Sequence, residues 1–185
     1  IFGGNHALDF KAGLGYRQYD EYTAPDGPLV PAGMKSTTAN AALGWRPGRN
    51  KRLWNAVTYT REEDVDFPSM PMDNIATDFW VYNAGWRSTY EEHTVSRLEI
   101  TGGFSVVDHF MDNSNKPNRS TLEAEAITES DSMSAGLTSD WNLSDRSNLE
   151  AGLDYGNLDR DGVRERHIVA SGQTFYDHIW PDVSQ

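Results

Sequence analysis

Histidine and methionine occur together at one point of the sequence, where His109 and Met111 are separated by a single residue. In an extended strand, residues i and i+2 project to the same face, so an imidazole nitrogen and a thioether sulfur can reach one point. Soft thioether ligands combined with imidazole select copper, and Cu(I) in particular, over hard cations that prefer oxygen. The pair therefore predicts a copper site.

A second pair of methionines, Met70 and Met72, has the same spacing, although a proline lies between them. Met72 and Met111 are each followed by Asp-Asn, so a carboxylate is expected beside each thioether. We include Met70 and Met72 as candidate metal ligands. The alternative interpretation is that these methionines and His109 only cover junctions between loops and strands.

The sequence lacks the residues and motifs that several other kinds of functional site require. Cysteine is absent, which excludes disulfides, thiolate zinc sites and cysteine nucleophiles. The sequence contains no Ser-His-Asp order, no glycine-rich phosphate loop and no HExxH motif, so we do not expect an enzyme. The remaining histidines have no soft neighbour at matching spacing and are expected at the surface; they are His6, His93, His167 and His178.

Charge and hydropathy exclude further classes. The 185 residues include 28 acidic and 16 basic side chains, a net charge of −12, whereas nucleic-acid binding needs a basic footprint. The longest apolar runs are only a few residues, which excludes a transmembrane helix of about 20 residues but not transmembrane strands. Ile1–His6 has neither an initiator Met nor a signal peptide. We therefore expect an interior segment of a longer protein.

Hydrophobic residues alternate with polar residues along most of the chain. This period of two is typical of strands with one apolar face. It explains how six Trp, eight Tyr and seven Phe occur with a mean hydropathy of only −0.66. The alternating stretches are approximately 7–19, 39–46, 53–59, 80–90, 98–106, 122–143 and 149–155.

The connections between these stretches alternate in length. Short turns are predicted at 47–50, 91–93 and 144–147, and long loops at 22–35, 67–76 and 108–120, with a fourth loop at 159–166. This alternation, with aromatic residues near the short turns, is typical of outer-membrane barrels. Those aromatic residues are Trp45, Trp86, Tyr90 and Trp141. A soluble up-and-down barrel is the alternative that would give the same pattern.

Three motifs then carry a resemblance to a known family. Pro71-Met72-Asp73, His109-Phe110-Met111-Asp112-Asn113 and Trp180-Pro181-Asp182-Val183 follow one another in the order found in the copper-receptor branch of the TonB-dependent outer-membrane receptors. The resemblance implies an all-β fold, an antiparallel transmembrane β-barrel meander. Residues 1–185 would form part of a single barrel domain, contributing about seven or eight strands to a plugged barrel of about 22 strands. The plug domain and the TonB box would lie outside this chain.

The same resemblance implies a function and partners. Such a receptor takes up copper across the Gram-negative outer membrane, contacts outer-membrane lipid and draws energy from the TonB complex. His109 and Met111 would bind copper from the extracellular-side loops, with further soft ligands from the plug. Met70 and Met72 would form a capture site at the entrance.

Two other functions remain open at this point. A ferric-siderophore receptor would use aromatic and arginine side chains of the loops instead of thioethers, and Tyr22, Arg119 and Arg164 are its candidate residues. A structural or adhesive outer-membrane barrel would carry no small-molecule cargo and would contain no metal.

Overall fold

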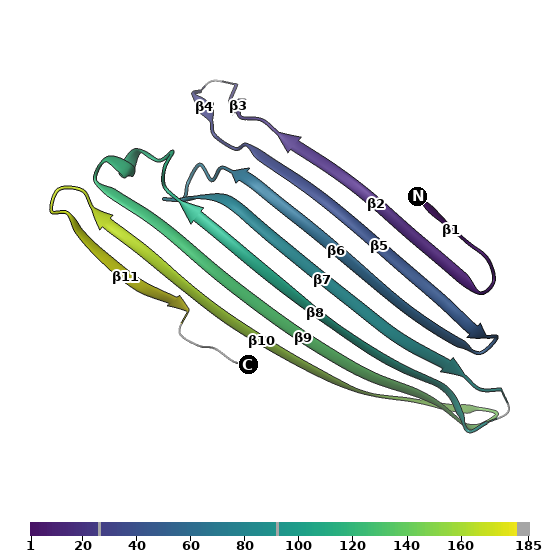
Figure 1. Cartoon of the computed structure of the whole chain (residues 1–185). Coiled ribbons are helices and arrows are strands. Elements are labelled where there is room, and N and C mark those ends of the chain that lie inside the picture. The colour runs from purple at the N-terminus through teal and green to yellow at the C-terminus, as the bar shows by residue number, and fades with distance from the viewer. Residues whose placement is uncertain (26, 92, 181–185) are drawn as a thin grey trace.

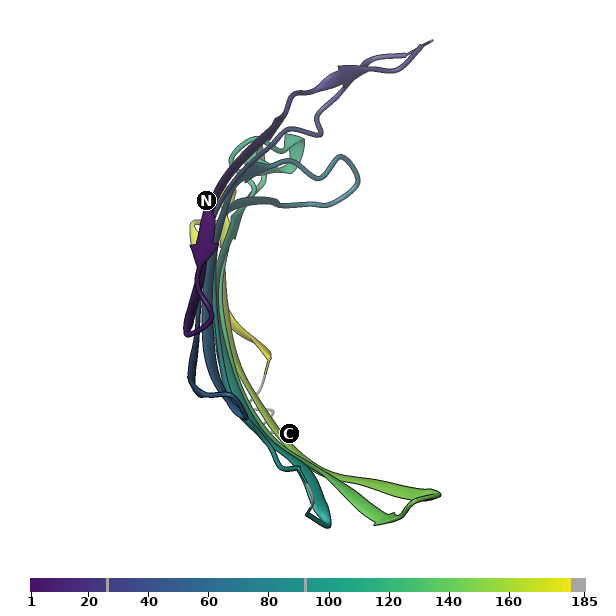
Figure 2. The ribbon, with the colours of Figure 1, turned by 90° about the vertical axis from the view of Figure 1, so that its right-hand side faces the viewer.

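A computed structural model describes residues 1–25, 27–91 and 93–180, and its strands form a curved antiparallel sheet (Figures 1 and 2). This confirms the predicted all-β antiparallel fold. The sheet order is β1-β2-β5-β6-β7-β8-β9-β10-β11, a meander interrupted only by the small β3-β4 hairpin. In the described part of the chain, no helix has the length and apolar character needed to cross a membrane.

The strands have the following bounds: β1 (Phe2–Gly4), β2 (Leu8–Tyr19), β3 (Tyr22–Thr23), β4 (Leu29–Val30), β5 (Met34–Gly48), β6 (Lys51–Val65), β7 (Asp73–Thr89), β8 (Val95–Asp112), β9 (Leu122–Ser144), β10 (Ser147–Ile168) and β11 (Gln173–Trp180). One short 3-10 helix, η1 (Pro117–Ser120), lies between β8 and β9. In the third predicted motif, residues 181–183 lie outside the described residues.

The strands extend further than the hydrophobic alternation indicates, and this corrects two predictions. Over the described residues the main sheet has nine strands, not seven or eight, because β1 and β11 also pair. Residues 159–166, predicted as a loop, continue β10 and pair with both β9 and β11. Charged side chains on both faces hide the alternation there, while the backbone hydrogen bonds of the ladder continue regardless of side-chain polarity.

The long strands β2 and β5–β10 each have an apolar face and a polar face. In β8, Ile100 and Phe104 lie on the apolar face, and Glu99, Thr101 and Ser105 lie on the polar face. Antiparallel pairing keeps residues of one face together across neighbouring strands, so both faces are continuous over the sheet. We use "polar face" and "apolar face" in this sense below.

The polar face is the concave side of the curved sheet. In β9, Ala124, Ala126 and Thr128 of the polar face expose only 5%, 5% and 8% of their surface. Ile127 of the apolar face, between two of them, is 63% exposed. Side chains crowd together on the inside of a curved sheet and spread apart on its outside, which accounts for this contrast.

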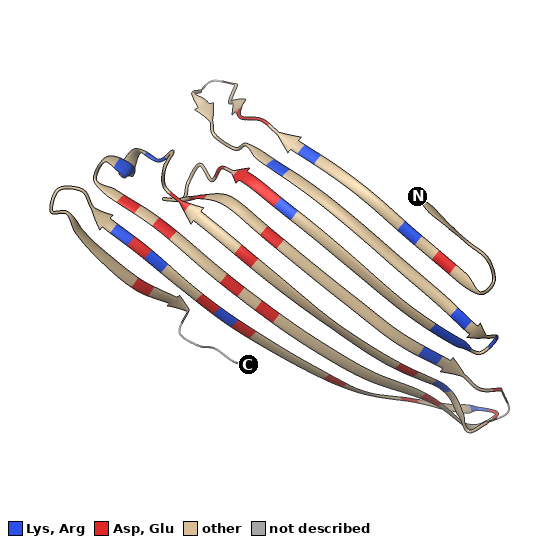
Figure 3. Cartoon of the chain, viewed as in Figure 1, with Lys and Arg blue, Asp and Glu red and all other residues tan. Residues whose placement is uncertain are grey.

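A band without charged residues crosses the middle of the central strands (Figure 3). It comprises residues 53–60 of β6, 79–86 of β7, 100–107 of β8 and 132–139 of β9. On the apolar face the band ends at a cross-strand row of charges, formed by Arg61, Asp78, Asp108 and Glu129. The charged row therefore marks the upper edge of the band.

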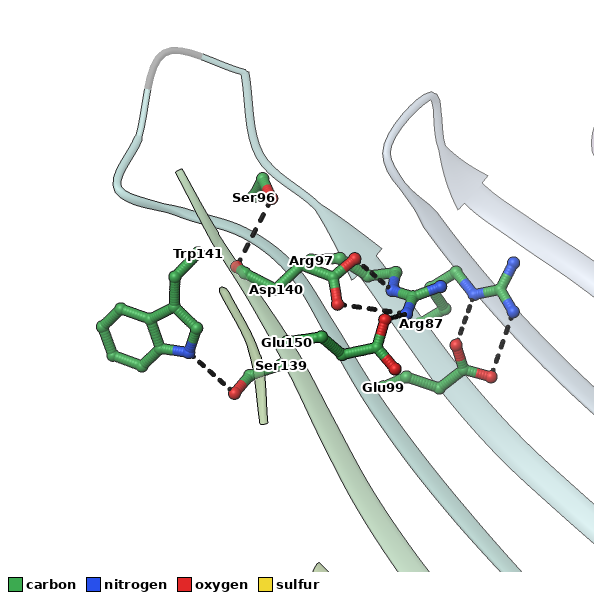
Figure 4. A network of polar contacts seen from close by, with 8 residues as sticks. All are labelled: Arg87, Ser96, Arg97, Glu99, Ser139, Asp140, Trp141 and Glu150. Carbon is green, nitrogen blue, oxygen red and sulfur yellow. Dashed lines mark hydrogen bonds and ion pairs between the residues drawn. The ribbon is translucent and has the colours of Figure 1, made fainter. Parts of the chain in front are cut away.

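Ion pairs line the polar face near the short turns (Figure 4). Arg87 binds Glu99 through two hydrogen bonds of 2.8 and 3.0 Å, and Arg97 lies 2.9 Å from Asp140 and 3.5 Å from Glu150. These contacts join β7, β8, β9 and β10 across the sheet. These contacts pair Arg87 and Arg97 with carboxylates at this end of the polar face.

The loop after β8 folds back onto the start of β9. Asn113 is fully buried, accepts a hydrogen bond of 2.9 Å from the Ala124 amide and donates one of 2.6 Å to the Leu122 carbonyl. Lys116 reaches across to β7, where its Nζ lies 2.6 Å from Asp73 Oδ1 and donates to the Phe67 carbonyl at 2.7 Å. The loops at 66–72 and 113–121 are thereby held together beside the ends of β7 and β8.

Candidate copper site

His109 and Met111 both lie on the polar face, near the end of β8 that leads into the loop at 113–121. Their Cα partners in β7 are Thr77 for His109 and Asn74 for Met111. The expectation that these two ligands lie in a loop is wrong, because β8 continues to Asp112. The strand places both side chains on one face, two residues apart, so that both can reach one metal ion.

One imidazole nitrogen of His109 is already engaged by its neighbour. The Thr77 hydroxyl and His109 Nδ1 form a hydrogen bond of 2.6 Å, which leaves Nε2 as the nitrogen available to a metal. A hydrogen bond to the second nitrogen orients the ring and fixes its tautomer in many metal sites. Thr77 is therefore a positioning residue for His109.

The protonation state of His109 also suits metal binding. His109 lies beside the charged row, at the level of Asp108, and so above the uncharged band. Burial lowers the pKa of His109, and the nearby Glu62 carboxylate opposes that shift more weakly. The imidazole is consequently neutral at neutral pH, and the neutral form is the one that binds a metal.

Asn74 places an unused oxygen next to Met111. The residue is only 3% exposed, and its Oδ1 is buried without a hydrogen-bond partner among the described residues. Buried polar atoms are nearly always paired in folded proteins, so an unpaired one indicates a missing partner. The Oδ1 atom of Asn74, the sulfur of Met111 and Nε2 of His109 thus form a group of potential ligands on one face.

The two aspartates that follow the methionines have other roles. Asp73 binds Lys116 and accepts a hydrogen bond of 2.8 Å from the Phe67 amide. Asp112 accepts hydrogen bonds of 2.9 and 2.7 Å from the amide and hydroxyl of Ser114, which closes a turn. Both carboxylates stabilise loops, and Thr77 is the group that contacts the imidazole.

Met70 and Met72 lie apart from His109. Met70 is 50% exposed in the loop before β7. Met72 immediately precedes β7 and is half-buried, two residues before Asn74. The structure thus brings Met72 to the end of β7 that adjoins Met111 and leaves Met70 further out. Within residues 1–25, 27–91 and 93–180, no three His, Asp or Glu side chains converge as a separate metal site.

The fold is similar to that of two solved proteins, a copper transporter and a ferric yersiniabactin uptake receptor. The chain superimposes on the copper transporter OprC with a TM-score of 0.81, at 17% identity over 98% of this chain. It superimposes on the ferric yersiniabactin uptake receptor FyuA from Yersinia pestis with a TM-score of 0.59, at 14% identity over 96% of this chain. The chain spans 29% of the OprC chain and 30% of the FyuA chain.

At these identities the similarity establishes a shared fold, the antiparallel meander of a barrel wall. No family model matches the sequence, and no curated protein matches it.

Proposed function

We propose that this chain is a barrel segment of a TonB-dependent outer-membrane transporter that takes up copper, with His109 and Met111 as ligands. The observation that carries the proposal is the pairing of an imidazole Nε2, without a hydrogen-bond partner among the described residues, with a thioether two residues along the same face. Thioether and imidazole favour copper, and Cu(I) especially. The unpaired Oδ1 of Asn74 beside Met111 supports a ligand at this point.

The geometry of the sheet supports a position in the Gram-negative outer membrane. The uncharged band is eight residues long in β6, β7, β8 and β9, or about 27 Å along each strand at about 3.4 Å per residue. For strands tilted by about 40°, this length corresponds to about 20 Å along the membrane normal. The apolar band of an outer-membrane barrel is about 25 Å tall. Lipid would cover the apolar face, and the aromatic residues near the short turns would lie at the periplasmic interface.

The proposed partners follow from the same assignment. The copper ion is the transported substrate, bound from the polar face. TonB would act through parts of the receptor outside this chain, and further soft ligands would come from the plug. Met72, and less directly Met70, would contribute to capture at the outer opening.

Copper uptake by cells tests the proposed function. We expect cells that express the full gene to accumulate copper in a TonB-dependent manner, and the His109→Ala variant to lose most of that accumulation at equal receptor abundance. The measurement is cellular copper by elemental mass spectrometry in tonB-positive and tonB-deficient cells. Equal copper in wild-type and empty-vector cells would refute copper uptake.

Thr77 should tune copper affinity without binding copper. Thr77→Val keeps the shape of the side chain and removes the hydroxyl that holds His109 Nδ1. Loss of such an outer hydrogen bond typically costs about 10–100-fold in metal affinity. Competition with a chromophoric Cu(I) chelator measures the effect. Thr77→Ser, which keeps the hydroxyl, serves as the matched control and should bind within about threefold of wild type.

A ferric-siderophore receptor is the second candidate function, and the similarity in fold to FyuA favours it. The residues predicted for it are dispersed: Tyr22 lies in the separate β3 strand, Arg119 pairs with Glu123 at 3.6 Å and Arg164 pairs with Asp177 at 3.2 Å. Growth of iron-starved cells on ferric chelates distinguishes the candidates. Receptor-dependent growth that is unchanged in His109→Ala would favour iron over copper.

A further inference from the structure

A depression lies on the apolar face between β2 and β7. Its volume is about 490 Å³, which falls within the range of about 300–1,000 Å³ that is typical of sites for small ligands. The strand register explains why it forms. Ala12 and Ala41 are cross-strand partners, and Ala39 lies in the row above them, so that short side chains make up the floor. Larger side chains surround this floor; they are Leu14, Val57, Tyr59 and Trp80.

Two stacked aromatic rings close the side of the depression toward β7. Tyr59 and Trp80 are cross-strand partners, and the centres of their rings lie 4.4 Å apart. Trp80 is 46% exposed, so much of its ring surface is open to a ligand. Both residues belong to the uncharged band. An apolar chain lying along the floor would therefore pack against this aromatic wall at the depth of the membrane interior.

Two positive charges lie on the apolar face just above the depression. Arg61 follows Tyr59 by two residues on β6, and Lys35 precedes Ala39 by four residues on β5. On β8, β9 and β10 the apolar face instead carries carboxylates at this level and just below it (Figure 3); they are Asp108, Glu129, Asp131, Asp159 and Asp161. A negatively charged headgroup is thus favoured over β5 and β6 and repelled over β8, β9 and β10.

Both cations remain accessible to a further anion, although each is paired. Lys35 Nζ lies 2.7 Å from Asp64, and the Arg61 guanidinium lies 3.1 Å from Glu63 and 3.0 Å from Asp78. The side chains of Lys35 and Arg61 are 47% and 41% exposed. Exposed ion pairs contribute little free energy, and phosphate oxygens form strong charge-assisted hydrogen bonds with such cations. A phosphate can therefore share or replace these carboxylate partners.

We infer that this depression binds an acyl chain of a phosphate-bearing lipid from the outer leaflet. The alanine floor and the rings of Tyr59 and Trp80 take the hydrocarbon chain, and Lys35 and Arg61 bind the phosphate of the headgroup. The inference rests on the outer-membrane position in the proposed function, because only there does this face meet lipid. It does not depend on copper.

Lipid binding by the full-length receptor in detergent tests the role of the cations. Dioleoylphosphatidylglycerol is titrated and followed by native mass spectrometry, which gives the apparent Kd of the first bound lipid. Dioleoylphosphatidylcholine, with the same chains and no net charge, should bind at least about fivefold more weakly. Arg61→Gln should weaken phosphatidylglycerol binding about fivefold. Arg17→Gln, the same change on the polar face of β2, is the matched control and should bind as wild type.

Filling the depression provides a second and independent variant. Ala41→Phe places a ring on the floor, and because Ala41 is exposed, the ring can be accommodated without displacing buried side chains. This variant should weaken phosphatidylglycerol binding about tenfold or more. Ala135→Phe makes the same change at an exposed position on the apolar face of β9, outside the lining of the depression, and should bind as wild type.

The results separate this inference from the proposed function. Equal affinity for the two lipids, or wild-type affinity in Arg61→Gln, would overturn the role of the cations and with it the inference. Wild-type affinity in Ala41→Phe would overturn the depression as the site. Neither result would affect copper uptake, because copper binding is measured separately on the same samples. A receptor that binds lipid as expected but no copper would refute copper uptake and support this inference.

Discussion

Replacing His109 by alanine is expected to weaken Cu(I) binding by about 100-fold or more, equivalent to about 2.7 kcal/mol. The substitution removes the proposed nitrogen ligand and leaves Met111 as the only thioether of β8. A thioether alone is a weak ligand, and the hydroxyl of Thr77 does not replace an imidazole. Competition against a chromophoric Cu(I) chelator, with the receptor in detergent, measures the difference.

His167 provides the matched control for this experiment. Its Nδ1 forms the same kind of contact with a cross-strand threonine, Thr174, at 3.0 Å. However, the residue two positions further along is Val169 and not a methionine. His167→Ala should therefore bind copper as wild type does. An equal loss in both variants would show a general effect of histidine removal and would contradict the assignment of His109.

Replacing Lys116 by methionine is expected to lower the free energy of local opening of the loops beside the site by about 3 kcal/mol. The equilibrium constant for opening would then rise about 150-fold. Lys116 and Asp73 expose only 9% and 5% of their side chains, so the change leaves a buried carboxylate without its counter-ion. Hydrogen exchange of the segment 113–124, measured by mass spectrometry, reports the opening. The affected hydrogen bonds join Asn113 to Ala124.

Two further variants test whether the uncompensated charge of Asp73 causes the loosening of the loops. Adding Asp73→Asn to Lys116→Met removes the uncompensated charge and keeps an acceptor for the Phe67 amide, so it should restore at least half of the lost protection. Lys35→Met breaks the exposed pair of Lys35 with Asp64, whose side chains are 47% and 60% exposed, and should leave the hydrogen exchange of the segment 113–124 unchanged. Equal exchange in wild type and Lys116→Met would contradict a buried ion pair at this position.

The alternation of side chains was sufficient to predict the antiparallel sheet, and the spacing of His109 and Met111 was sufficient to place them on one face. Both are properties of a single strand, where the period of two is visible in the sequence. The ends of strands were less predictable. In β10, Asp159, Arg160 and Asp161 read as a loop because polar side chains point to both sides of a strand that remains paired.

The residues around the candidate ligands depend on register between strands. Thr77 faces His109 through the regular register of β7 and β8, whereas Asn74 faces Met111 only because β7 contains an irregularity between Asn74 and Ala76. Lys116 reaches Asp73 from a different loop, across 43 residues of sequence. A run of alternating residues does not encode these pairings, because a shift of one residue in register would turn every side chain to the other face.

Metal content tests the central proposal most directly. The full-length receptor, isolated in detergent from copper-supplemented cells, would be analysed by elemental mass spectrometry beside the His109→Ala/Met111→Ala double variant. We predict near-stoichiometric copper in wild type and background copper in the double variant. Copper-free wild-type protein would contradict the account. Iron in its place would favour the ferric-siderophore receptor, and a protein free of metal would favour a structural or adhesive barrel.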